Sequence, residues 1–239
     1  MSRPDYLNMK SESQSEPVVM EAGRQGNTYE VAADSSKVLR NTYMLLSMTL
    51  LFSAVTAGIA MAINMPPLGI IITMVGYFGL LFLTEKTKNS AMGIVSVFAL
   101  TGFMGLTLGP ILSYYVSLPG GTQTVLTALG GTGLIFFAMS GWVLSTGKEL
   151  SGWGKSLMIG LIVAFVLSIA NIFLGLPVLS LAVSGLFIIL SSALIAYQTS
   201  AIIHGGETNY ISATVTLFVS IYNIFLSLLQ ILGVMGSDD

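Results

Sequence analysis

Residues 91–117 read AMGIVSVFALTGFMGLTLGPILSYYVS, a long apolar run without one charged side chain. An α-helix rises about 1.5 Å per residue, so about 20 apolar residues cross a hydrocarbon core about 30 Å thick. The run is long enough to span a bilayer and has no polar face to turn toward water. It therefore predicts a transmembrane helix.

The composition of the whole chain agrees with this reading. Only 8% of the 239 residues are charged, whereas about a quarter are charged in an ordinary soluble domain. Six acidic and five basic residues fall in the first 40 positions, so charge is scarcest in the remainder of the chain. That remainder cannot form a soluble globular surface.

Six more segments are long and apolar enough to cross a membrane, and charged residues or Pro and Gly turns separate them. The seven predicted spans are residues 43–63, 68–84, 91–117, 125–145, 156–174, 178–203 and 211–235. We expect an all-α, polytopic membrane protein whose seven-transmembrane-helix bundle occupies residues 37–239. The alternative is a re-entrant pair formed by the sixth and seventh segments, because the link between them, residues 204–210, contains no Lys or Arg.

The tail before the bundle, residues 1–36, is rich in Ser, Glu, Asp, Asn and Gln. Such a segment buries too little apolar area to offset the entropy of ordering, so we expect it to be disordered. Around residues 37–44 the alternative is a short amphipathic helix on the membrane surface. The polar opening is unlike a signal peptide, so the first span is expected to remain as a signal anchor.

The Lys and Arg residues predict the orientation in the membrane. All nine fall in the tail, in the loop after the second span or in the loop after the fourth span, which lie on one side of a seven-span protein. Positive residues collect in cytoplasmic loops. The N-terminus is therefore expected in the cytoplasm and the C-terminus on the periplasmic side; the re-entrant alternative would move the C-terminus inside.

Glycines within the spans predict close helix packing. Gly105 and Gly109 are four residues apart on the third span, a spacing that lets two backbones approach in lipid. Residues 130–133 (GGTG) resemble a phosphate loop only superficially, because no strand precedes them and no Lys-Ser follows, so we interpret them as a packing notch. Pro110 is expected to kink the third helix, or alternatively to break it beside a cavity.

No set of residues in the sequence predicts catalysis. Cysteine is absent, and no Asp, Glu, Lys, Arg or His lies inside a span, where ionisable residues usually mark ion or proton pathways. We therefore expect no catalytic, cofactor or metal site, and no nucleic-acid binding, because basic residues are not clustered. His204 and Glu207 lie in a polar turn, which we interpret as flexible and interfacial, or alternatively as a proton-sensitive contact to a partner.

Several uncharged polar residues do enter the spans. They are Asn171, Gln198, Thr216, Ser220 and Asn223. Buried amides and hydroxyls in a membrane usually hydrogen-bond across helices, so we interpret them as interhelical contacts, with a permeation or ligand role as the alternative.

Four motifs resemble a known family. They are residues 37–43 (KVLRNTY), 109–113 (GPILS), 203–210 (IHGGETNY) and 222–227 (YNIFLS). Together they are similar to the bacterial branch of the Bax inhibitor-one (TMBIM) family, over roughly residues 37–233 and most specifically over residues 203–227.

The resemblance implies a seven-helix inner-membrane protein with a cytoplasmic N-terminus that binds and inhibits the FtsH protease and is itself a substrate of FtsH. The alternative within the family is a calcium or proton leak that depends on two aspartates, one in each of the last two helices. Gln198 and Ser220 stand at those positions here, and neither ionises near neutral pH, which disfavours proton gating. A regulatory binding protein is therefore preferred to an ion pathway, and both are preferred to a membrane enzyme.

Overall fold

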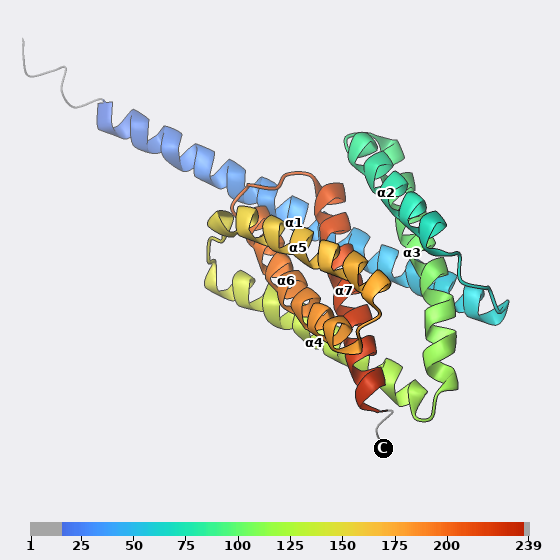
Figure 1. The fold of residues 1–239 in the computed structure, drawn as a ribbon. Coiled ribbons are helices and arrows are strands. Elements are labelled where there is room, and N and C mark those ends of the chain that lie inside the picture. Colours follow the sequence, from blue (N-terminus) through green and yellow to red (C-terminus); the bar gives the residue numbers. More distant parts are fainter. Residues whose placement is uncertain (1–15, 237–239) are drawn as a thin grey trace, which may run out of the picture.

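The computed structural model describes the backbone of residues 16–236 and the side chains of residues 34–236. Its helices are α1 (Glu16–Ala62), α2 (Ile70–Thr87), α3 (Ala91–Ser117), α4 (Gly121–Thr146), the 3-10 helix η2 (Ser151–Trp153), α5 (Gly154–Leu174), α6 (Pro177–Ile203) and α7 (Tyr210–Met235). Residues 16–236 contain no strand, and seven of their helices are long and apolar enough to cross a membrane (Figure 1). The predicted all-α membrane fold is confirmed.

Helix α1 begins at Glu16, within the segment for which the sequence predicts a disordered tail. Its first turns run well beyond the other helices, at the blue end of the ribbon (Figure 1). Extending an existing helix costs far less than starting a new one, and the membrane-spanning part, Asp34–Ala62, provides that start. Residues 16–36 therefore differ from the prediction, and residues 37–44 belong to the same continuous helix. Residues 1–15 lie outside the described part.

Helices α1 and α3 meet along small residues, which we call the glycine seam: Gly105 and Gly109 of α3 against Ser53, Ala57 and Ala60 of α1. A Cβ atom on Gly105 would overlap the carbonyl oxygen of Ser53, and one on Gly109 would overlap Ala60. The two backbones can be this close only because both α3 residues lack a side chain. The close approach predicted from the Gly105 and Gly109 spacing is confirmed.

The glycines of α4 pack differently from this expectation. A Cβ on Gly131 would come within 3.1 Å of Leu228 of α7, whereas one on Gly130 or Gly133 would meet no described atom within 4 Å. The predicted packing notch is therefore wrong for Gly130 and Gly133, because these residues lie away from the helices that α4 contacts.

Helix α7 lies at the centre of the bundle and packs against α1, α3, α4 and α6. It buries Leu217, Phe218, Ile224 and Leu229 almost completely. Helices α2 and α5 are peripheral, since α2 packs mainly on α3 and α5 mainly on α6 (Figure 1). Most of their apolar surface therefore faces outward, where lipid surrounds a membrane protein.

The lengths of the helices bear on two alternatives left open by the sequence. Helix α3 runs without interruption from Ala91 to Ser117, so Pro110 does not break it. Helices α6 and α7 have 27 and 26 residues, and each is long enough to span the membrane alone. Their lengths favour two complete spans over a re-entrant pair.

Candidate functional site

Gln198 and Ser220, where the resemblance to the family places its aspartate pair, are both in the interior of the bundle. Gln198 on α6 is 5% exposed, and Ser220 on α7 is fully buried. The Ser220 hydroxyl donates to the carbonyl oxygen of Thr216 at 2.8 Å, and the Gln198 Nε2 has no hydrogen-bond partner among the described residues. Neither side chain can share a proton as a carboxylate pair does.

The hydroxyl of Thr199, next to Gln198, lies among three helices. Its Oγ1 is 3.3 Å from the Ser140 hydroxyl of α4 and 3.5 Å from the Tyr43 hydroxyl of α1. It also donates to the carbonyl oxygen of Ile195 at 2.8 Å. Thr199 therefore brings α1, α4 and α6 together through uncharged groups.

A second polar contact joins α6 to α7 nearer their other ends. The Ser184 hydroxyl donates to Gln230 Oε1 at 2.6 Å, and Gln230 Nε2 donates to the Ser180 hydroxyl. Interhelical polar contacts thus form at Thr199 and Gln230, whereas the expected residues Thr216 and Ser220 donate to carbonyl oxygens of their own helix. The sequence does contain a pattern that indicates a polar face on α6. Ser184, Ser191 and Gln198 recur every seven residues and share one face of this helix.

Hydrogen bonds hold the turn that contains His204 and Glu207. His204 Nδ1 donates to the carbonyl oxygen of Ser200 at 2.9 Å. Ser200 Oγ donates to the Lys148 carbonyl oxygen at 3.0 Å and accepts from the Leu150 amide at 2.9 Å. The turn is therefore tied to the loop between α4 and α5.

Asn209 ties the same turn to the loop between α2 and α3. Its Oδ1 accepts from the Ile211 and Ser212 amides and so caps the N-terminus of α7, a position that favours Asn. Its Nδ2 donates to the Lys88 carbonyl oxygen at 3.2 Å and to Asn89 Oδ1 at 2.8 Å. Its backbone amide donates to Glu207 Oε1 at 2.8 Å.

These bonds connect three loops, residues 88–90, 147–153 and 204–209, into one surface, which we call the basic face because Lys86, Lys88, Lys148 and Lys155 lie on or beside it. His204 and Glu207 are both part of it. Among residues 34–236, no three His, Asp or Glu side chains are grouped as a metal site would need. The hydrogen bonds between its loops hold the basic face together as one surface.

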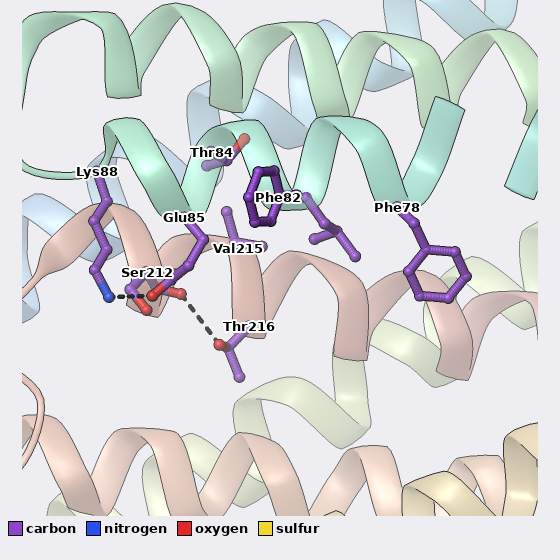
Figure 2. A pocket seen from close by; sticks show the side chains of 9 residues that line it. Phe78, Phe82, Thr84, Glu85, Lys88, Ser212, Val215 and Thr216 are labelled. Carbon is purple, nitrogen blue, oxygen red and sulfur yellow. Dashed lines mark hydrogen bonds and ion pairs between the residues drawn. The ribbon is translucent and has the colours of Figure 1, made fainter. Parts of the chain in front are cut away.

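A cavity of about 370 Å³ opens beside the basic face, between the ends of α2 and α7. Figure 2 shows the ion pair of Lys88 and Glu85 at one end and Phe78 at the other. The hydrogen bond to Glu85 raises the pKa of Lys88, so its ammonium stays charged at physiological pH.

Comparison with known proteins gives consistent matches over this chain. A family described as "Inhibitor of apoptosis-promoting Bax1" matches residues 35–237. The "Modulator of FtsH protease YccA" of Escherichia coli strain K12 is 55% identical over 202 residues, which cover 84% of this chain and 92% of the relative. An "Inner membrane protein YccA" of E. coli O6:H1 has the same identity and coverage.

An uncharacterized protein of Pseudomonas aeruginosa is 50% identical over 204 residues, covering 85% of this chain and 92% of the relative. The family match includes the motifs at residues 37–43, 109–113, 203–210 and 222–227. The resemblance predicted from those motifs is confirmed, and the chain belongs to the Bax inhibitor family of membrane proteins.

Proposed function

We propose that this protein is an inner-membrane regulator that binds the FtsH protease, slows the degradation of other FtsH substrates and is itself degraded slowly. The observation that carries the proposal is the 55% identity, over 92% of its length, to a relative named as a modulator of FtsH. The second E. coli relative, named as an inner membrane protein, supports the location.

The positive-inside rule supports the orientation that this function needs. Lys37 and Arg40 of α1 and the lysines of the basic face lie at one end of the bundle. In the proposed orientation this end faces the cytoplasm and Met235 lies near the periplasmic surface. The tail and the basic face are then on the same side of the membrane.

The proposed mechanism is competition by a substrate that resists extraction. The first turns of α1 extend beyond the basic face (Figure 1) and offer the protease a segment to grip. Pulling α1 out of the membrane requires the glycine seam with α3 to separate and the hydrogen bond from the Thr214 hydroxyl to the Thr42 carbonyl oxygen, 3.3 Å long, to break. While the bundle resists, the protease is occupied. The protein acts here by binding rather than by catalysis.

The test is paired. FtsH is expected to co-purify with the full chain from detergent-solubilised membranes, and deletion of residues 1–36 is expected to lengthen the lifetime of the protein in cells. Unchanged turnover of the shortened chain would count against the tail as the handle. Absence of FtsH after crosslinking in intact membranes would refute the binding itself.

A calcium or proton leak is the second candidate, and four buried polar atoms favour it. Thr42 Oγ1, Asn171 Oδ1, Ser191 Oγ and Gln198 Nε2 have no hydrogen-bond partner among the described residues, and water or an ion would satisfy such groups. Calcium flux into liposomes that contain only this protein tests the alternative. Steady flux would favour the leak over the regulator.

A further inference from the structure

The cavity between α2 and α7 has the depth of one membrane leaflet. Its lining runs from Phe78 of α2 to Lys88, the residue that follows this helix, and ten residue steps of a helix rise about 15 Å. This is half of a hydrocarbon core about 30 Å thick. The ring of Phe78 meets that of Phe165 of α5 edge to face, with centroids 5.8 Å apart. The aromatic pair lies at the deep end, so the cavity extends from the membrane surface to about the midplane.

The cavity wall changes character along this depth. Its deep part is formed by Phe78, Leu81, Phe82 and Val215, which are apolar. The hydroxyls of Thr84 and Thr216 also line it, but they donate to the carbonyl oxygens of Leu80 and Ser212 in their own helices. These walls suit a hydrocarbon chain, and an apolar cavity of this kind gives water few partners.

The mouth of the cavity carries one charge of each sign. Figure 2 shows the Glu85 carboxylate between the Lys88 ammonium and the side chain of Thr216. The Glu85 side chain is 61% exposed and that of Lys88 is 29% exposed, so both can reach a group outside the protein. An exposed ion pair of neighbouring residues contributes little to stability, so either partner can exchange its contact at small cost.

Hydrogen bonds of Asn209 hold the mouth of the cavity in place. Asn209 caps α7 and donates to the Lys88 carbonyl oxygen, so it connects the two helices whose ends border the opening. Helix α2 packs mainly on α3 and leaves the side toward α7 open along the cavity. A ligand can therefore enter from the lipid, between the two helices.

We propose that this cavity holds one phospholipid of the adjacent leaflet, with an acyl chain along Phe78, Phe82 and Val215 and a zwitterionic phosphoethanolamine headgroup at Lys88 and Glu85. The phosphate pairs with the Lys88 ammonium and the headgroup ammonium pairs with the Glu85 carboxylate. Charge complementarity selects this headgroup over an anionic one, since Glu85 repels a headgroup that has only negative charge. The proposal does not depend on binding to FtsH.

The test uses the full chain in mild detergent, with phosphatidylethanolamine and phosphatidylglycerol of identical acyl chains as probes in native mass spectrometry. The wild-type protein is expected to retain one phosphatidylethanolamine in preference to phosphatidylglycerol. Lys88→Gln is expected to lower its retention about tenfold, as the loss of a charge-assisted contact does. Lys86→Gln is the matched control, because Lys86 is in the last turn of α2 but does not line the cavity.

Equal retention of the two lipids, or equal loss in the two lysine variants, would overturn the proposal. A second measurement needs no variant: phosphatidylethanolamine with a photoreactive acyl chain is crosslinked to the wild-type protein in membranes. Labels are expected to concentrate between Phe78 and Phe82 and near Val215. Labels spread evenly over exposed apolar residues such as Ile162 and Phe173 of α5 would contradict a specific lipid-binding site.

Discussion

The two helices of the α2–α3 hairpin pack in two different ways. Helix α3 lies backbone to backbone against α1, and ten of its residues are buried in the bundle. In α2 the buried residue is Thr84, and a cavity separates the end of this helix from α7. We infer that the glycine seam resists unfolding, whereas the looser packing of α2 leaves room for a ligand.

The largest expected effect is at the glycine seam. Gly105→Ala places a methyl group on the Ser53 carbonyl oxygen, which belongs to backbone and cannot rotate away. We expect a loss of about 2–3 kcal/mol in the free energy of unfolding, measured by denaturant titration in detergent micelles. Gly130→Ala is the control, since its methyl group meets no described atom within 4 Å. Equal stability of the two variants would contradict the importance of the seam.

The next effect is at Asn209, which holds the cavity mouth. Asn209→Ala removes the α7 cap and both bonds to Lys88 and Asn89. We expect a loss of about 1–2 kcal/mol and faster amide hydrogen exchange in residues 88–90 and 210–213. Asn89→Ala is the milder control because it removes only one of these bonds. Exchange that changes equally in the two variants would show that the cap has no special role.

Gly76→Ala tests the contact between α2 and α3 with the same added methyl group. Here the methyl group meets the ring of Phe103, a side chain that can move, and alanine also favours the helix. We expect a change below about 1 kcal/mol in the same titration, clearly less than for Gly105→Ala. A loss as large as at Gly105 would remove the distinction between the two sides of the hairpin.

The smallest expected effect is at the cavity mouth. Lys88→Gln removes an exposed ion pair with Glu85, and such pairs contribute about 0–1 kcal/mol. The free energy of unfolding should therefore stay nearly constant, and any change in lipid retention reflects binding. A loss well above 1 kcal/mol would mean that the pair holds α2 in place.

The sequence predicts those features that depend on local composition. Seven apolar segments, bounded by charged residues or by Pro and Gly turns, are enough to predict the seven long helices. The spacing of Gly105 and Gly109 is enough to predict one close contact between helices. The start of α1 at Glu16 differs from the predicted disordered tail because helix extension depends on the neighbouring span and not on the composition of the tail.

Contacts between distant segments cannot be predicted from the sequence alone. Asn209 reads as a residue in a polar turn, and its bonds to Lys88 and Asn89 join positions about 120 residues apart. Gly130 has the same sequence character as Gly105, but only the arrangement of helices decides which of the two has a neighbour. The cavity exists because the end of α2 is separated from α7. No sequence pattern in either helix predicts this separation.

The most direct test of the account is degradation by FtsH in proteoliposomes. A reporter membrane substrate is mixed with FtsH and either the wild-type chain or the Gly105→Ala variant at equal amounts. The wild-type chain is expected to slow reporter degradation, while the variant is itself degraded faster and slows the reporter less. Reporter degradation that is unaffected by the wild-type chain, or equally slowed by both proteins, would contradict it.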